Sequence, residues 1–142
     1  MINYPISFYA NAETHMGVED AWQVEASDFK TSCSVPKEFE GGGEALSPED
    51  YYLMALQNCF VATFKVYAKY SKLSFSQLQV KAELIVDKDQ EAKPFMKTVK
   101  LDVKISEASD EKKAQLLYKK TLENGFILRS IKTEIMANLS MI

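Results

Sequence analysis

The chain has 142 residues, 46% of them hydrophobic and 26% charged, which is the composition of an ordinary globular protein and not of a disordered one. Its formal net charge of −3 gives no reason to expect binding to nucleic acid or to an anionic membrane. At this length we expect a single domain, residues 1–142, with a hydrophobic core of its own.

The N-terminus and the cysteine content indicate the compartment. Residues 1–15 have neither a basic region nor a long apolar run, and no stretch reaches the roughly 18–20 apolar residues of a membrane helix. We therefore expect a cytoplasmic protein with no membrane association, in which Cys33 and Cys59 are free thiols. With His15 as the single histidine and no cysteine pair at ligand spacing, we expect no metal site and no cofactor.

Three short strands are expected in the first 35 residues, at 2–10, 21–26 and 29–35, where aromatic and β-branched residues are frequent. Alternation in the third strand places Phe29, Thr31 and Cys33 on one face. Three consecutive glycines, Gly41–Gly43, then predict a flexible connection into the first helix.

A long helix is predicted from Ser47 to about Tyr70. Ser47 is a suitable N-cap, Pro48 suits the first helical position, and Glu49 and Asp50 place negative charge at the positive end of the helix dipole. The helix is apolar nearly all round, which predicts burial on more than one side. We expect a sheet to cover one side and a second subunit to cover the other.

The second half of the chain predicts a hairpin, a helix and a final strand. Apolar residues alternate over 78–86 and 99–105, on either side of a polar loop at 87–94, so the hairpin should have one face in water. A helix should begin at 109–111 and end at Asn124–Gly125, and alternation over 131–139 predicts the last strand. This order of elements indicates an α+β fold.

Each cysteine has a structural interpretation. A cysteine in an apolar helix packs like a small hydrophobic residue, and burial raises the pKa of a thiol. Cys59 lies in the middle of the predicted helix, away from its positive N-terminal end. Cys33 is interpreted in the same way, as a strand residue packed in the core. A reactive role for Cys59 requires a cation or hydrogen-bond donors from elsewhere in the molecule.

The segment around Cys59 resembles the OsmC/Ohr family, the osmotically inducible protein C and organic hydroperoxide resistance proteins. The resemblance rests on "VPKEFEGGGEALSPED" and "SPEDYYLMALQNCF", which are followed by "VATFKVYAKYSKLSFSQLQVKAEL". In that family a Pro-Glu dipeptide begins a helix, a cysteine lies ten residues after the glutamate, and a β-hairpin follows. The resemblance implies an OsmC-like fold, with antiparallel sheets packed around a long central helix in an intertwined homodimer.

The family resemblance also implies a chemistry. A reactive cysteine attacks a small hydrophobic hydroperoxide, becomes a sulfenic acid and condenses with a second cysteine, and a dithiol reductant resets the disulfide. By matched position Cys59 would be the attacking thiol, and Glu49 the acid that helps to organise the site. The alkyl part of the substrate would occupy an apolar pocket lined by aromatic residues such as Phe60, Tyr51 and Tyr52.

The sequence departs from the family pattern at two places. In "GFILRSI", which matches the segment of the second cysteine, Gly125 stands in the place of that cysteine, and we interpret it as a left-handed helix C-cap. The family's peroxidases also use an arginine from the N-terminal strands, but Arg129 is the first arginine of this chain. Cys33 is a candidate resolving cysteine besides its core interpretation.

Candidate cations in place of the arginine are Lys30, Lys37 and His15, although a lysine lacks the planar fork of arginine and His15 is better interpreted as a surface-loop residue.

Helix geometry predicts that the site needs two chains. Ten residues separate Glu49 from Cys59, or about 15 Å along the axis at roughly 1.5 Å per residue, so the two side chains cannot meet within one helix. Two antiparallel helices crossing at a two-fold axis would bring Glu49 of one chain near Cys59 of the other.

Three functions remain open at this point. The first is a thiol peroxidase that an external thiol recycles, and the second is a catalytically weak or inactive homodimer that holds a small hydrophobic ligand in an interface pocket. The third is a structural dimer without chemistry.

Overall fold

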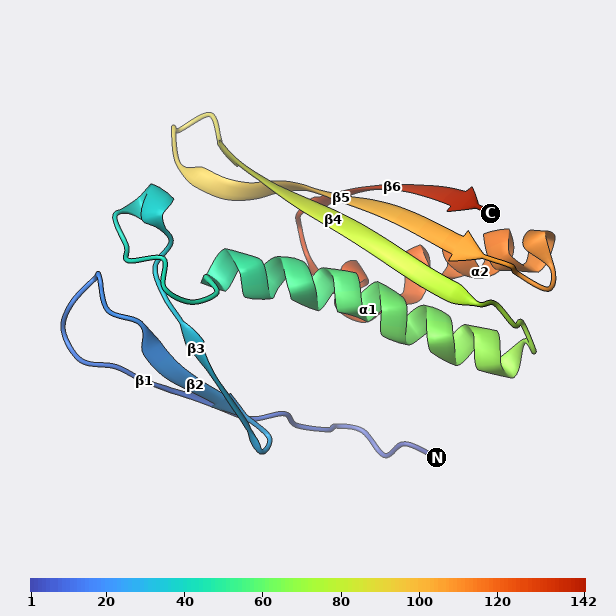
Figure 1. Ribbon diagram of the computed structural model, residues 1–142, viewed down its shortest axis with the longest axis horizontal. Helices are drawn as coiled ribbons and strands as arrows, with labels where there is room; N and C mark the ends of the chain where they lie inside the picture. The colour runs from blue at the N-terminus through green and yellow to red at the C-terminus, as the bar shows by residue number, and fades with distance from the viewer. The chain divides into compact units, whose positions relative to one another are not determined.

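The computed structural model describes residues 1–142 and confirms the expected α+β fold. Figure 1 shows the elements in the order β1, β2, β3, η1, α1, β4, β5, α2, η2 and β6. The chain divides into two compact units, Met1–Tyr51 and Tyr52–Ile142, which we describe separately. Helix α1, Pro48–Tyr70, begins in the first unit and continues through the second. The single domain expected over residues 1–142 stays a prediction.

The first unit contains an antiparallel sheet of three short strands, β1 (Ala10–Glu13), β2 (Trp22–Ala26) and β3 (Phe29–Cys33), in the order β1-β2-β3. The two later strands lie where the sequence predicts them. The strand expected at residues 2–10 is wrong except for its last residue, because the β1–β2 ladder begins only at Ala10 and leaves residues 2–9 without a strand to pair with.

The connection from β3 to α1 is a packed turn and not the flexible segment that its glycines suggest. It contains the short helix η1, Lys37–Phe39, and the Gly41 N–H donates to the Pro36 carbonyl at 3.1 Å. A Cβ atom on Gly41 would collide with the Val35 carbonyl, and Gly43 has a φ of +64°, where glycine is favoured. The glycines therefore permit close approach of the backbone.

Helix α1 begins with a capping box, as the sequence predicts. The Ser47 N–H donates to Oδ2 of Asp50 at 2.9 Å, and the Asp50 N–H donates to Oγ of Ser47 at 3.1 Å. The two bonds satisfy backbone donors that have no partner inside the helix. The helix ends at Tyr70, and Lys72 then takes a left-handed conformation with a φ of +56°. Both predicted ends of this helix are confirmed.

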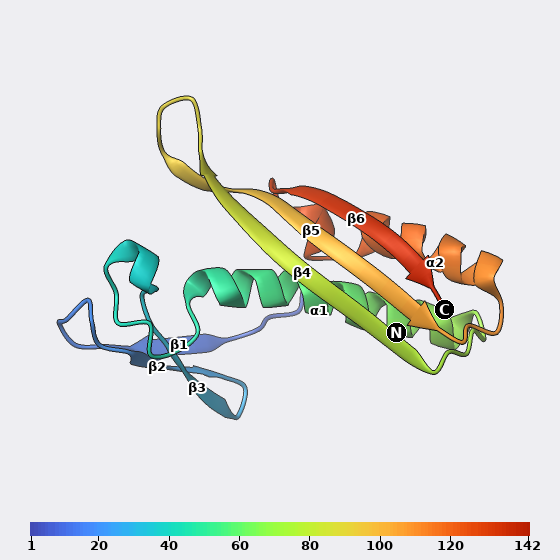
Figure 2. The same ribbon diagram turned by 45° about the horizontal axis from the view of Figure 1, so that its top comes forward.

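The second unit contains a mixed sheet in the order β4-β5-β6, with bounds Gln77–Lys88, Pro94–Ser106 and Glu134–Met141. Strands β4 and β5 form the predicted hairpin, which has a register shift at Ile85/Val86. Strand β6 is parallel to β5, and Figure 2 shows it on the far side of β5 from β4. The parallel pairing requires a crossover connection, which helix α2 (Glu111–Asn124) provides.

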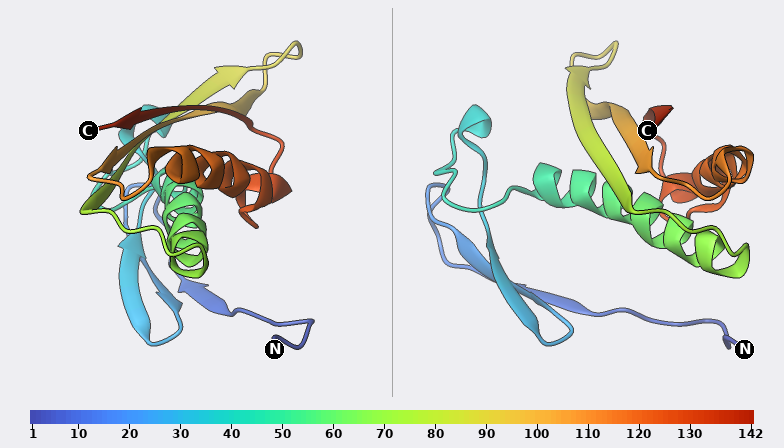
Figure 3. Two further views of the ribbon diagram at one scale, coloured as in Figure 1. Left: turned by 90° about the vertical axis from the view of Figure 1, so that its right-hand side faces the viewer. Right: turned by 45° about the vertical axis from the view of Figure 1, so that its right-hand side comes forward.

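Both helices of the second unit lie on one face of this sheet (Figure 3). The rings of Phe60 and Phe64 stack with centroids 6.0 Å apart. The ring of Tyr118, from α2, packs against Phe60 with the two ring centroids 5.9 Å apart. The Gln57 side chain donates to the Val80 carbonyl at 2.7 Å and ties α1 to β4. The sheet contributes a continuous layer to this core: Val80, Val99, Leu101, Val103 and Ile105.

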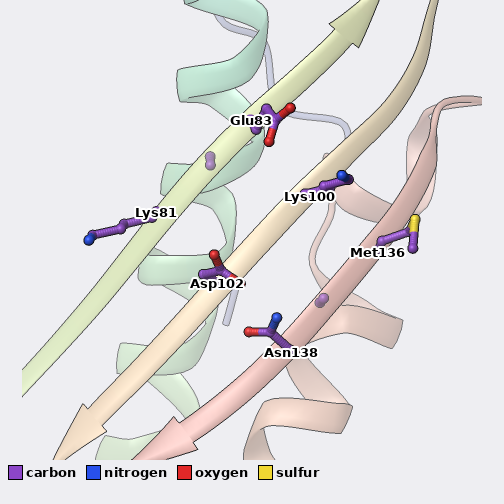
Figure 4. Close-up of a pocket in the computed structure, with 8 residues that line it drawn as sticks. Lys81, Glu83, Lys100, Asp102, Met136 and Asn138 are labelled. Carbon is purple, nitrogen blue, oxygen red and sulfur yellow. The ribbon is translucent and has the colours of Figure 1, made fainter.

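The opposite face of the sheet is polar, as expected for a hairpin with one face in water. A shallow depression of about 450 Å³ lies across its three strands. Lys81 stands opposite Asp102 in the strand register, and Glu83 stands opposite Lys100, so unlike charges face one another without forming ion pairs. Figure 4 shows the labelled side chains of this face: Lys81, Glu83, Lys100, Asp102, Met136 and Asn138.

Helix α1 buries only one stripe of its apolar surface within the chain. Leu56, Phe60, Phe64 and Ala68 follow one another at intervals of four residues and are buried. Other apolar residues of the helix remain exposed, among them Val66 at 50%. The second subunit expected over this side of the helix stays a prediction. Neither α1 nor α2 combines the length and the apolar character that a membrane-crossing helix requires.

Adjacent leucines of α2 test this assignment of the core. Leu117 is 4% exposed and Leu116 is 64% exposed. Replacing Leu117 with alanine should lower the free energy of unfolding by about 2–5 kcal/mol, because the change leaves a cavity in the core. The Leu116→Ala change should lower it by less than about 0.5 kcal/mol. Urea unfolding followed by circular dichroism measures both, and equal effects would contradict the packing.

Candidate functional site

Cys59 lines an apolar pocket of about 400 Å³ in the second unit. Its side chain is half-buried, and its thiol is free. None of the residues around the pocket is charged, so a ligand here would meet mainly carbon atoms. The other lining residues come from α1 and from the end of α2: Ala62, Thr63, Val66, Tyr67, Asn124, Phe126 and Ile127.

The helical period places Cys59 at the border of the core. Cys59, Thr63 and Tyr67 are spaced by four residues and therefore share one face of α1. The core stripe that contains Phe60 and Phe64 runs one position further round the helix. The Cys59 side chain consequently faces the pocket and is not sealed among the core aromatics.

Gly125 is the residue next to the Cys59 sulfur. Its φ of −56° and ψ of 126° are not left-handed, so the expected left-handed C-cap is wrong. The Gly125 N–H donates the last helical hydrogen bond, to the Thr121 carbonyl at 2.9 Å. The helix ends there because Gly125 has an extended ψ. A Cβ atom added to Gly125 would lie 3.1 Å from Sγ of Cys59. The same Cβ atom would lie 3.0 Å from Leu128, so glycine allows the backbone to pack closely against the sulfur at this buried position.

Cys33 lies in the first unit, where it is buried and free. Burial raises the pKa of its thiol, a backbone hydrogen bond from Ser34 lowers it, and the charges of Glu49 and Asp50 raise it further, so the pKa lies above its usual value. The thiolate is the reactive form of cysteine, so these surroundings disfavour Cys33 as a nucleophile. The expectation that both cysteines are free thiols agrees with the structure.

Glu49 lies in the first turn of α1. One of its carboxylate oxygens, Oε2, is buried and has no hydrogen-bond partner. Such groups are rare in folded proteins, and each calls for an explanation such as a bound water, an ion or a role in a functional site. Ten helical residues, about 15 Å along the axis, separate Glu49 from Cys59, so α1 itself does not bring the two side chains together.

The aromatic residues expected around the substrate have other contacts. Phe60 is fully buried in the core, the Tyr51 hydroxyl donates to the Ser32 carbonyl at 2.7 Å, and the Tyr52 hydroxyl pairs with that of Thr133. None of the three lines the pocket beside Cys59. Their role in substrate binding stays a prediction.

The candidate cations do not line this pocket either. Lys30, Lys37 and His15 are exposed residues of the first unit. Arg129 lies in the short helix η2, Leu128–Ser130, where its backbone N–H donates to the Gly125 carbonyl at 2.9 Å and its side chain is exposed.

The pocket also contains residues that the sequence did not indicate. Thr63 and Tyr67 could have been predicted, because they follow Cys59 at intervals of four residues and so share its face of the helix. Phe126 and Ile127 carried no such signal, because they reach the pocket through the tertiary contact between the end of α2 and α1.

Comparison with known proteins places this architecture in a family. The OsmC-like protein family matches residues 41–140, well over half of the chain. The chain belongs to the OsmC-like protein family. The uncharacterized protein YmaD of Bacillus subtilis is 32% identical over 80 residues, which make up 56% of this chain and 53% of YmaD. The match thus spans about half the length of that relative.

Solved structures of OsmC-like proteins have the same fold. An OsmC-like protein of unknown function from Vibrio cholerae superposes with a TM-score of 0.82 at 19% identity, over 96% of this chain and 100% of that one. An organic hydroperoxide resistance protein OsmC from Legionella pneumophila gives a TM-score of 0.75 at 25% identity, over 98% of both chains. The resemblance to the OsmC/Ohr family and the predicted OsmC-like fold are confirmed. The expected antiparallel pairing is wrong for β5 and β6, which are parallel because α2 forms a crossover between them. The intertwined homodimer stays a prediction.

The contact between Cys59 and Gly125 can be tested with an engineered disulfide. In a disulfide the Cβ of one cysteine lies about 3 Å from the sulfur of the other, and the Cβ position at residue 125 lies 3.1 Å from Sγ of Cys59. In the Gly125→Cys variant the introduced thiol should therefore form a disulfide with Cys59 on mild oxidation, with loss of two free thiols.

Peptide mass mapping under non-reducing conditions identifies the bond. The Gly125→Ser variant is the matched control and should keep both thiols of the wild type. A Gly125→Cys protein that folds but pairs its introduced thiol with Cys33, or with no cysteine, would contradict the described geometry.

Proposed function

We propose that this OsmC-like protein reduces organic hydroperoxides through Cys59, and that an external dithiol of the reducing cytoplasm recycles it. The observation that carries the proposal is the position of the Cys59 side chain, half-buried at the wall of an apolar pocket and beside a residue without a side chain. The Legionella relative, which is named an organic hydroperoxide resistance protein, supports this reading.

The proposed reaction has two stages. The Cys59 thiolate attacks the terminal oxygen of ROOH, the O–O bond breaks, and the products are Cys59 sulfenic acid and, after protonation, the alcohol ROH. One thiol of the reductant then displaces water from the sulfenic acid to form a mixed disulfide. The second thiol of the reductant attacks that disulfide, which restores the Cys59 thiol and oxidises the reductant.

An external reductant is needed in this scheme because the chain offers no suitable second cysteine. Gly125 has no thiol, although it is the residue beside the Cys59 sulfur. Cys33 lies buried in the first unit with a raised thiol pKa. We assign Cys33 a structural role and propose a one-cysteine mechanism.

We further propose that the active form is a homodimer, in which Glu49 of one copy approaches Cys59 of the other. Three observations support it: the unpartnered oxygen of Glu49, the exposed apolar side of α1, and the N-terminal segment. In that segment Phe8 and Tyr9 are 90% and 82% exposed, and large exposed apolar surfaces mark interaction sites. An antiparallel crossing of the two α1 helices at a two-fold axis would also cover the uncovered helix side.

A second candidate function is the binding of a small hydrophobic ligand without turnover. The uncharged lining of the pocket favours it, because no side chain there would stabilise a thiolate. Under this alternative the pocket still takes an apolar ligand, and Cys59 serves as one of its walls.

Peroxide consumption decides between these functions. With cumene hydroperoxide and dithiothreitol or dihydrolipoamide, the wild type should turn over, and Cys59→Ser should lose at least about 100-fold in rate, because the attacking sulfur is removed. Cys33→Ser should retain its rate within about twofold. A ferrous-oxidation assay for residual peroxide measures all three proteins.

Two outcomes of that assay contradict the proposal. A wild-type rate equal to the rate in buffer would exclude the peroxidase and leave the binding function. Equal losses in Cys59→Ser and Cys33→Ser, with both variants folded, would indicate a disulfide couple in place of the one-cysteine mechanism.

The homodimer is tested by mass in solution. Sedimentation equilibrium at micromolar concentration should give twice the chain mass of 16.1 kDa. Phe8→Asp should shift the equilibrium toward the monomer, because it places a charge on a surface that the second copy would cover. Asp28→Asn, a change at an exposed position of the same unit, is the control. A wild-type monomer under these conditions would contradict the two-chain site.

A further inference from the structure

Lys120 is a cation beside the otherwise uncharged Cys59 pocket. Its Nζ lies 4.8 Å from the centroid of the Tyr67 ring, a cation–π contact, and Tyr67 lines the pocket. Neither ion pair of the chain involves Lys120, so Glu123, the nearest carboxylate along α2, does not neutralise it within ion-pair distance. The ammonium group is therefore free to pair with an anion from outside the chain.

The two helices fix where this charge stands relative to the sulfur. Gly125, directly after α2, lies beside Cys59, and Lys120, five residues earlier in the chain, lies beside Tyr67. Along α1, Cys59 and Tyr67 are eight residues apart, or about 12 Å along the helix axis. The thiol therefore lies at one end of the pocket, and at the other end the Lys120 ammonium group lies over the ring of Tyr67, a lining residue.

The space between the two ends is suited to an alkyl chain. It is lined by Ala62 and Val66 of α1 and by Phe126 and Ile127 after α2. Asn124, also on the lining, donates its side-chain N–H to the Lys120 carbonyl at 2.9 Å, which fixes the amide against the last turn of α2. A ligand that fits both ends has an apolar body and one anionic head group.

We propose that Lys120 makes this pocket selective for amphipathic acids, with the carboxylate at Lys120 and the chain directed along α1 toward Cys59. The inference deepens the proposed function, since it names the residue that chooses among hydrophobic ligands of the same pocket. Lys120 here determines specificity and has no part in the bond-breaking step. The attraction depends on the charge of the head group and not on the alkyl chain.

Equilibrium binding of a matched ligand pair tests the role of Lys120. Decanoate and methyl decanoate share one alkyl chain and differ in head-group charge, and neither can react with the thiol. Displacement of Nile red, a neutral dye, from the reduced protein gives both affinities. Lys120→Gln should weaken decanoate by about two- to fivefold, the range expected for a partly exposed ion pair, and leave methyl decanoate unchanged.

The neighbouring residue provides the control. Lys119 is also exposed, and consecutive helix positions do not share a face, so Lys119→Gln should leave both affinities unchanged. Lys120→Glu should weaken decanoate further than Lys120→Gln, because it replaces attraction with repulsion. Raising the salt concentration should weaken decanoate binding to the wild type more than to Lys120→Gln.

Several outcomes would overturn the proposal: equal changes for decanoate and methyl decanoate in Lys120→Gln, equal effects of Lys119→Gln and Lys120→Gln, or no binding of either probe to the wild type. The binding test is independent of turnover. Head-group selectivity without peroxide reduction would overturn the proposed peroxidase and support the role of Lys120. Peroxide reduction without head-group selectivity would support the peroxidase and overturn the role of Lys120.

Discussion

The structure of the second unit depends on one packing contact, the stripe of α1 that lies against the β4-β5-β6 sheet. Leu56, Phe60, Phe64 and Ala68 form this stripe, and all four are buried. Their burial removes a large apolar area from water, which is the dominant favourable term in folding. Because the helix is rigid, this contact also fixes the direction of every other side chain on α1.

The position of Cys59 is a consequence of that packing. A residue directly before Phe60 stands at the edge of the buried stripe, so its side chain reaches the pocket that α1 forms with the end of α2. The same rigidity carries Thr63 and Tyr67 to the pocket and places Tyr67 under the Lys120 ammonium group. The positions of the thiol and of Tyr67 thus follow from the register of α1, and the packing of α2 adds Lys120 and the rest of the pocket wall.

Gly125, where the sequence departs from the family pattern, has a structural effect at Cys59. Its backbone conformation is one that any residue can adopt, so the turn itself does not require glycine. What glycine contributes is close packing, because a Cβ atom at this position would lie 3.0 Å from Leu128 and 3.1 Å from Sγ of Cys59. Since Gly125 is buried and has no thiol, an external thiol in our proposal reaches Cys59 from the pocket.

Local signals in the sequence determined much of the fold. The capping residues Ser47 and Asp50 set the start of α1, alternation set the β4–β5 hairpin, and the motif around Cys59 indicated the family, because each depends on residues close together in the chain. Only the tertiary structure decided the parallel pairing of β6, the conformation of Gly125, the meeting of Cys59 with the residues after α2, and the contact of Lys120 with Tyr67. The last two depend on how α2 packs against α1, a contact between segments far apart in the chain, which no local pattern encodes.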